Sequence, residues 1–207
     1  MSARSWGDFT REDYLRMIDR QWPFWASLSE FVLANGITSA VEVGCGIGHL
    51  CFLVDSYIGI DLNQAIITGN EVFYRRGRWR CGDWLTMDGL EGDLFVASAV
   101  IAHCESFQAF LEKALSLPCR YFVVSFSKGL RDYEKIQKHP TGEFFENYYC
   151  RSDVEAFLYG LPWLGSWAIY DFPLSRRERQ ARMASVLVID RTGECQLEMW
   201  GKRALYA

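Results

Sequence analysis

Residues 40–49 constrain the fold of this chain most strongly, because an apolar run leads there into three glycines at every second position. Gly44, Gly46 and Gly48 permit a turn in which a ligand approaches the backbone, since a side chain there would block that approach. A second apolar run ends in Asp61, 13 residues after Gly48 and 17 after Gly44. This is close to the spacing at which a strand-end acid meets a ribose diol in a nucleotide-binding βαβ unit.

The glycine spacing also discriminates between ligands. Dinucleotide-binding loops prefer G-x-G-x-x-G, with a pyrophosphate held at the helix N-terminus, and Gly48 comes one residue too early for that pattern. Glu42 would place negative charge near the loop, which disfavours a pyrophosphate. We therefore expect a ligand that carries a cation or an ammonium group.

Strand and helix patterns alternate along most of the chain. Thr10 and Asp13 form a capping pattern at the start of an N-terminal helical segment that Pro23 interrupts. The alternation predicts a parallel sheet covered by helices on both faces, with ligands bound at the carboxyl ends of the strands. Expected strands are 39–43, 57–61, 78–81, 93–99, 121–127, 167–172, 185–189 and 196–200. Residues 10–35 are expected to be helical, with a second helix over about 24–34 after Pro23, and the other expected helices are 48–55, 64–74, 105–116 and 152–159.

Composition limits the classes of protein to which the chain can belong. The 207 residues, half of them hydrophobic, suit one domain with a sizeable core. A net charge of −4 disfavours sequence-independent nucleic-acid binding. The seven cysteines and three histidines show no zinc spacing, which predicts no metal and reduced thiols in a cytoplasm. No signal peptide or membrane span is expected.

The run Glu42-Val-Gly-Cys-Gly-Ile-Gly48 matches the pattern [DE]-x-G-x-G-x-G. At this point the chain resembles the class I S-adenosylmethionine-dependent methyltransferases, and the resemblance extends over about residues 41–191. It implies a Rossmann-like, mostly parallel seven-stranded sheet with the last strand antiparallel, helices on both faces and an N-terminal helical lid. It also implies a single domain spanning 1–207, made of a helical cap (1–36), a cofactor-binding core (37–128), and an insertion with a final helix and C-terminal strands (129–207).

The resemblance assigns cofactor contacts to the ends of successive strands. Asp61 would hold the ribose hydroxyls, although an ordinary helix-capping aspartate is the alternative. In Gly82-Asp83-Trp84, the carboxylate would accept from the exocyclic amine of adenine and the indole would lie against its face. The backbone of residues 97–99 would line the methionine end. The full expected cofactor set is Glu42, Gly44, Cys45, Gly46, Gly48, Asp61, Leu62, Asp83, Trp84, Ala97, Ser98 and Ala99.

His103 and Tyr148 are the candidate catalytic residues. The imidazole could remove a proton from an acceptor, or it could only support its loop, and Ala99 and Ala102 stand where acids are frequent in the family. Aromatic residues could cover the substrate or belong to the core. The expected substrate contacts are Tyr14, Trp22, Trp25, His103 and Tyr149. The basic residues 176–182 are consistent with a solvated loop or with a clamp for phosphate or carboxylate.

These features predict methyl transfer from S-adenosylmethionine to an oxygen or nitrogen of a small-molecule acceptor, with S-adenosylhomocysteine as product. The protein would act as a monomer or homodimer. Three alternatives remain open: a nucleotide-linked dehydrogenase or epimerase, an inactive methyltransferase-like binding module, and an RNA or protein methyltransferase.

Overall fold

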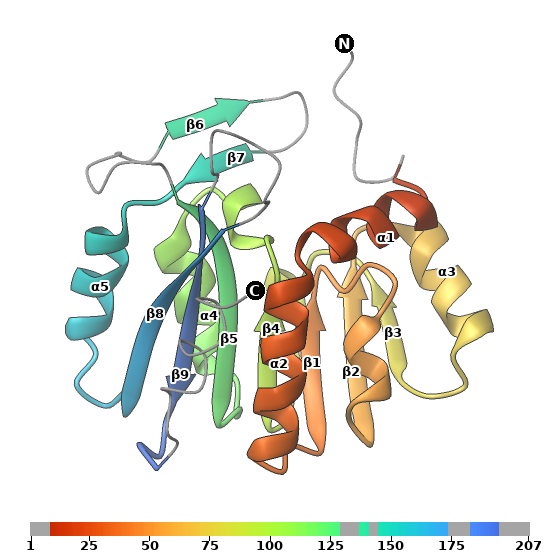
Figure 1. The fold of residues 1–207 in the computed structure, drawn as a ribbon, viewed down its shortest axis with the longest axis horizontal. Helices are drawn as coiled ribbons and strands as arrows, with labels where there is room; N and C mark the ends of the chain where they lie inside the picture. Colours follow the sequence, from red (N-terminus) through yellow and green to blue (C-terminus); the bar gives the residue numbers. More distant parts are fainter. Residues whose placement is uncertain (1–8, 129–136, 141–144, 174–182, 195–207) are drawn as a thin grey trace.

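A seven-stranded sheet forms the centre of the computed structural model, which describes residues 9–128, 137–140, 145–173 and 183–194 (Figure 1). The strand order is β3-β2-β1-β4-β5-β9-β8. Strand β9 is antiparallel to both of its neighbours, and the other pairs in the sheet are parallel. These strands are β1 Ser39–Val43, β2 Ser56–Asp61, β3 Arg78–Cys81, β4 Leu94–Ala97, β5 Tyr121–Lys128, β8 Ser166–Pro173 and β9 Met183–Asp190. The expected α/β class and the antiparallel last strand are confirmed for the described residues.

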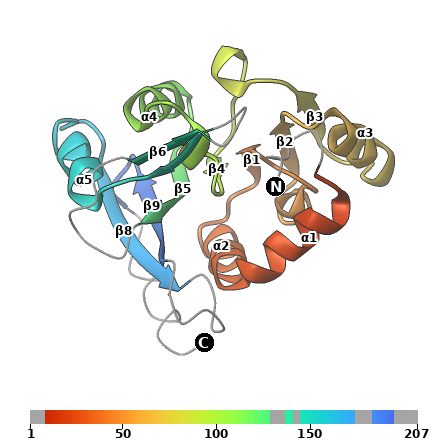
Figure 2. The same ribbon diagram turned by 90° about the horizontal axis from the view of Figure 1, so that it is seen from above.

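Helices cover both faces of the sheet, as Figure 2 shows from above. Helices α4 (Phe107–Ser116) and α5 (Arg151–Tyr159) bury apolar side chains against one face. Helix α2 (Trp22–Ala34), the 3₁₀ turn η2 (His49–Phe52) and helix α3 (Gln64–Phe73) contribute to the core on the other face. Alternate residues of the central strands enter the two cores, which is the arrangement expected for a sheet buried on both sides.

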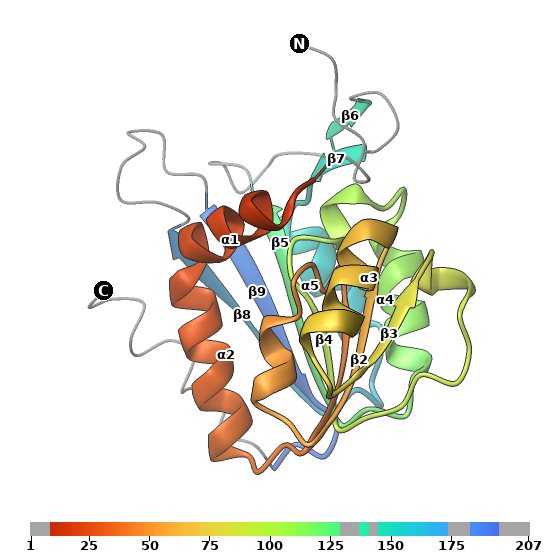
Figure 3. The ribbon, with the colours of Figure 1, turned by 90° about the vertical axis from the view of Figure 1, so that its right-hand side faces the viewer.

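The N-terminal segment forms two helices, and the break between them lies near Pro23 as predicted. Helix α1 (Arg11–Arg20) begins with the predicted capping box between Thr10 and Asp13. Pro23 occupies the first turn of α2, where its missing N–H leaves no helical hydrogen bond unmade. Helix α1 lies across the carboxyl ends of the strands, whereas α2 runs along the face of the sheet (Figures 1 and 3). A lid function for α1 stays a prediction.

Several elements differ from those expected. The segment 128–149 contains a strand pair, β6 (Gln137–Pro140) and β7 (Phe145–Tyr148), that the sequence did not reveal. A short η2 replaces the helix expected over 48–55, and two further 3₁₀ turns follow strands, η3 (Trp84–Thr86) and η4 (Ile101–His103). The predicted strand 196–200 and the basic residues 176–182 lie outside the described residues. Within the described residues, no helix has both the length and the apolar character that a membrane crossing needs.

Candidate functional site

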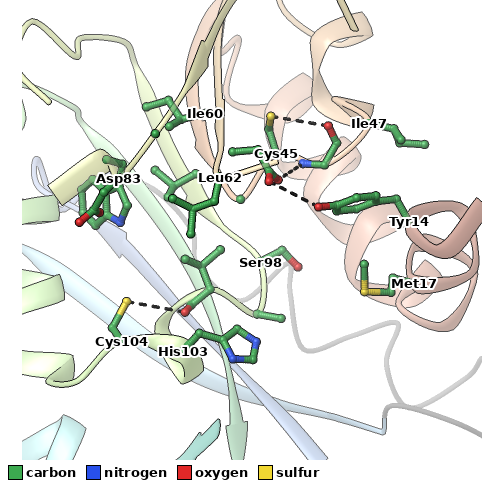
Figure 4. Close-up of a pocket in the computed structure, with 18 of the residues that line it drawn as sticks. Tyr14, Met17, Cys45, Ile47, Ile60, Leu62, Asp83, Ser98, His103 and Cys104 are labelled. Atoms are coloured by element: carbon green, nitrogen blue, oxygen red, sulfur yellow. Dashed lines mark hydrogen bonds between the residues drawn. The ribbon is translucent and has the colours of Figure 1, made fainter. Parts of the chain in front are cut away.

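A cavity of about 390 Å³ opens at the carboxyl ends of the parallel strands. Its wall comes from helices α1 and α2, the glycine loop after β1, and the segments that follow β2, β3 and β4 (Figure 4). This is where open α/β sheets bind ligands, and the volume is typical of small-molecule sites. Of the expected cofactor residues, nine line the cavity: Gly44, Cys45, Gly46, Asp61, Leu62, Asp83, Trp84, Ser98 and Ala99.

Asp61, the last residue of β2, links the glycine loop to the start of α3. Its Oδ2 accepts from the Gly46 N–H at 2.9 Å, and its Oδ1 accepts from the Asn63 N–H at 2.9 Å. The Tyr14 hydroxyl donates to Oδ1 at a longer 3.4 Å. Burial raises the pKa of Asp61, while the Asn63 and Gly46 N–H groups oppose the rise. A carboxylate has about four lone-pair sites, so acceptor capacity remains for a ligand.

Two loop glycines are required by neighbouring side chains of the protein itself. Gly46 and Gly48 have φ values of +49° and +70°, a region that only glycine adopts without strain. A Cβ on Gly46 would overlap the ring of Tyr14, and a Cβ on Gly48 would overlap the indole of Trp79. Gly48 is absent from the described lining of the cavity, so packing against Trp79 accounts for this glycine.

Glu42 is buried below the loop and is not among the described cavity-lining residues. The Tyr57 hydroxyl donates to its Oε2 at 2.5 Å. Burial raises the pKa of Glu42 to about 8, despite the opposing hydrogen bond from Tyr57. The side chain is therefore largely neutral at pH 7, and the expectation that Glu42 supplies negative charge to the ligand is not supported by its position.

Asp83 and Trp84 follow β3 and take different environments. Asp83 is exposed and caps η3, with Oδ1 accepting from the Leu85 N–H at 3.0 Å. Trp84 is 4% exposed and lies between Phe95 and Phe110, at ring separations of 5.3 and 4.8 Å. Trp84 therefore packs against core rings as well as lining the cavity. Its indole N–H has no hydrogen-bond partner.

A strained residue, Ala99, lies two residues after the end of β4. Ala99 is the one non-glycine residue with positive φ in the described part of the chain, at +58°. Its N–H donates to the hydroxyl of Ser125 on β5 at 2.8 Å, and the neighbouring Ser98 hydroxyl donates to Oε1 of Gln21 at 2.9 Å. Ser125 and Gln21 were missed from the sequence, because nothing in a single chain indicates which strand neighbour supports a loop. Ala97 is buried beneath and is not among the described lining residues.

His103 lines the cavity at the end of η4 (Figure 4). The predicted Tyr148 and Tyr149 are not among the described residues that line it. Tyr149 is buried, and its hydroxyl donates to the Ile101 carbonyl at 2.7 Å and the Cys104 carbonyl at 3.2 Å. Asn147 donates to the same Cys104 carbonyl at 2.6 Å. Tyr149 thus supports the segment that carries His103, and the structure offers no cavity contact for the predicted substrate role.

Of the three aromatic residues of the N-terminal helices that were expected to contact substrate, two line the cavity and one does not. Tyr14 and Trp25 line the cavity, whereas Trp22 is 56% exposed and packs against His49 at a ring separation of 6.3 Å. Trp25 also contacts the His49 ring, at 5.3 Å, and its buried indole N–H has no partner. Burial lowers the pKa of His49. Trp22 was expected to contact the substrate, but it is not among the described residues that line the cavity.

Known structures share this architecture. An S-adenosylmethionine-dependent methyltransferase from Clostridium acetobutylicum matches 86% of this chain over 98% of its own length, with 13% identity and a TM-score of 0.61. Magnesium protoporphyrin IX methyltransferase from Synechocystis, with bound S-adenosylhomocysteine, matches 90% of each chain with 15% identity and a TM-score of 0.61. The chain has the fold of the class I S-adenosylmethionine-dependent methyltransferases.

A third structural neighbour is the N-terminal domain of EvdMO1, solved in the presence of S-adenosylhomocysteine and D-fucose. It matches 81% of this chain and 82% of its own chain, with 14% identity and a TM-score of 0.61. No protein-family model matches the sequence, and no curated protein is significantly similar to it. At these identities the likenesses establish the fold.

The cavity of this methyltransferase fold is acidic. Three carboxylates line it, Asp61, Asp83 and Glu105, and its described lining contains no lysine or arginine. S-adenosylmethionine carries a sulfonium and an ammonium group, so its charge suits this lining. The remaining acceptor capacity of Asp61 also offers a polar partner to a ligand. The residues present therefore fit the cofactor. No group of residues that could hold a metal ion occurs among the described residues.

Proposed function

We propose that the protein transfers a methyl group from S-adenosylmethionine to an oxygen or nitrogen of a small-molecule acceptor. The observation that carries the proposal is the convergence of two carboxylates on one cavity that the Gly44–Gly46 loop also lines. Asp61 ends β2, and Asp83 follows the adjacent parallel strand β3. Asp61 would accept from the ribose hydroxyls and Asp83 from the adenine amine. The bound cofactor supplies an electrophilic methyl group on a positively charged sulfur.

The protein's own task is to position and desolvate the reactants. Helix α1 covers the cavity with Tyr14 and Met17, and exclusion of water favours transfer to a weak nucleophile. His103 is the group we propose to take the acceptor's proton, because it lines the cavity and an imidazole can act as a general base. The acidic lining favours an acceptor that binds without negative charge. Its reacting oxygen or nitrogen must be unprotonated at the moment of transfer, because a protonated amine has no lone pair to accept the methyl group.

We further propose that residues 1–207 act as one domain in the cytoplasm. The six described cysteines are all free thiols, which suits a reducing compartment. The assignments of Glu42, Gly48, Ala97, Tyr148, Trp22 and Tyr149 to direct ligand contact are not retained.

Calorimetric titration with S-adenosylhomocysteine tests the proposal. We expect saturable binding, and we expect Asp61→Asn to weaken it about 10- to 100-fold, because a charge-assisted hydrogen bond contributes about 1.5–3 kcal/mol. Asp55→Asn, an exposed acid, is the matched control and should bind like wild type. Thermal melting would show whether each variant is folded.

Two results would overturn the proposal. One is an absence of binding by the folded wild-type protein, and the other is tighter binding of a nicotinamide dinucleotide than of the homocysteine product. Binding without turnover of any hydroxyl or amine acceptor would support the inactive binding module instead.

A further inference from the structure

A positively charged surface rich in aromatic side chains lies on helix α3 and the turn that follows it. We define the basic aromatic surface by Arg11, Phe52, Phe73, Arg75, Arg76 and Arg78. The sequence Tyr74-Arg-Arg-Gly-Arg-Trp-Arg80 holds four arginines and no acid. We propose that the basic aromatic surface binds single-stranded nucleic acid.

Contacts bring together Arg11, Phe52 and Phe73 and the backbone of Arg76, and the exposed Arg75 and Arg78 adjoin them in the chain. The guanidinium of Arg11 lies 4.6 Å from the ring centroid of Phe73, and its Nη2 donates to the Tyr74 hydroxyl at 3.0 Å. The rings of Phe52 and Tyr74 are 5.1 Å apart. The carbonyl of Arg76 accepts from the Cys51 thiol beside Phe52. The start of α1, η2 and the end of α3 therefore meet here.

The arginines of this surface lack neutralising partners. Arg75, Arg76 and Arg78 are exposed, and no carboxylate of the described residues forms an ion pair with them or with Arg11. By contrast, Arg16, Arg120 and Arg151 each have an acidic partner. Unpaired guanidinium groups concentrated on a chain of net charge −4 indicate an anionic partner.

The aromatic rings favour nucleic acid over an acidic protein. Phe52 and Phe73 are both 67% exposed, although such rings are normally buried. Exposed rings beside arginines are the arrangement on which unpaired bases stack, while the guanidinium groups contact phosphates. An acidic protein surface would supply charge but no flat bases, and a duplex would keep its bases stacked internally.

Most of this surface lies away from the proposed methyl-transfer site. Arg75, Arg76 and Arg78 lie at the amino end of β3, whereas the cavity opens at the carboxyl ends of the strands. Arg11 belongs to α1 but is not among the described residues that line the cavity. Nucleic acid bound there would localise the protein without entering the cavity. The net charge alone argued against nucleic acid because it averages this surface with acidic regions elsewhere.

Fluorescence anisotropy of a fluorescein-labelled 12-nucleotide oligouridylate, titrated with the full chain, tests the inference. Contact with about three phosphates predicts a slope of log K against log[salt] of about −2, which is roughly tenfold weaker binding at 150 mM than at 50 mM NaCl. Arg75→Gln/Arg76→Gln/Arg78→Gln should weaken binding at least about tenfold and bring the slope close to zero. Phe52→Ala/Phe73→Ala should weaken binding several-fold and leave the slope unchanged.

A matched triple variant, Arg16→Gln/Lys113→Gln/Arg151→Gln, changes net charge equally and should bind within about twofold of wild type. Thermal melting would report whether each variant is folded, and titration with S-adenosylhomocysteine would report whether the cavity is intact. The inference is overturned by an absence of oligonucleotide binding at 50 mM NaCl, or by equal loss in the two triple variants. It is also overturned if a labelled oligoglutamate binds as tightly with the same dependence on the arginines, which would indicate an acidic protein partner.

Discussion

Ala99 concentrates strain at the wall of the cavity. A left-handed conformation costs a non-glycine residue roughly 1–2 kcal/mol, and such residues persist where surrounding structure holds them and often mark functional sites. The holding contact here is the 2.8 Å hydrogen bond from the Ala99 N–H to the hydroxyl of buried Ser125. Ser125 on β5 therefore positions the backbone at the end of β4.

Removing this hydroxyl tests its positioning role. We expect Ser125→Ala to lower the unfolding free energy by about 1–2 kcal/mol, because the Ala99 N–H loses its acceptor, and to weaken binding of S-adenosylhomocysteine. Urea unfolding and calorimetry measure the two effects. The control is Ser116→Ala, whose exposed hydroxyl only bonds a helix carbonyl. Equal behaviour of the two variants would show that Ser125 has no such role.

Glu42 makes stability depend on pH. Its folded pKa of about 8 exceeds the ordinary 4.5, so between these values the folded chain keeps a proton that the unfolded chain has lost. Stability from this group is therefore complete below pH 4.5 and falls as pH rises towards 8. Glu42→Gln cannot titrate, so its unfolding free energy relative to wild type should increase between pH 5 and pH 8. A difference that stays constant with pH would refute the buried neutral carboxyl.

Residue positions were predictable only where chain spacing determines them. Asp61 could be placed beside the glycine loop because parallel strands bring their carboxyl ends to one edge. Trp84 and Tyr149 could not be placed, because an aromatic residue near a strand end suits either a ligand or the core. The partners that decide, Phe110 and Ile101, lie on elements whose packing one sequence does not reveal.

At the scale of elements, β7 and the residue that follows it hold η4 in place, and η4 ends in the candidate catalytic residue His103. Tyr149 and Asn147 both donate to the Cys104 carbonyl, and Tyr149 also donates to the Ile101 carbonyl. These bonds determine where His103 enters the cavity. This segment therefore supports the site indirectly, and neither Tyr148 nor Tyr149 is among the described residues that line the cavity.

A single substitution removes the hydrogen bonds from Tyr149 to the Ile101 and Cys104 carbonyls. Tyr149→Phe deletes the hydroxyl without changing the ring, and we expect the unfolding free energy to fall by about 1–2 kcal/mol. Amide hydrogen exchange at residues 101–104 should become faster, because the local carbonyls lose their donor. Tyr159→Phe, on a 76% exposed ring, is the control. Unchanged exchange in Tyr149→Phe would contradict the supporting role.

Helices and strands were predictable only where the sequence carries a local signal for them. Residues 39–43 and 78–81 were predicted as strands with the bounds observed for β1 and β3, because apolar patterning and turn residues are local signals. The β6–β7 pair was missed, because residues 137–140 and 145–148 show no alternation of apolar and polar side chains. Whether α1 moves as a lid depends on energetics that no local pattern encodes.

The whole molecule separates its charges. The cavity at the carboxyl ends of the strands is lined by carboxylates, while unpaired arginines gather around the end of α3. This separation allows a cationic cofactor and an anionic partner to bind the same chain at different places. Taken alone, the net charge of −4 disfavours nucleic-acid binding, because it sums the charges of the whole chain and does not show where they lie.

The most direct test of the methyl-transfer proposal is a crystal structure of the protein grown with saturating S-adenosylhomocysteine. The account predicts electron density for the adenosyl group in the cavity, with both ribose hydroxyls within hydrogen-bonding distance of the Asp61 carboxylate and the adenine amine near Asp83. Density for the ligand elsewhere, or a cavity that contains only solvent at saturation, would contradict it.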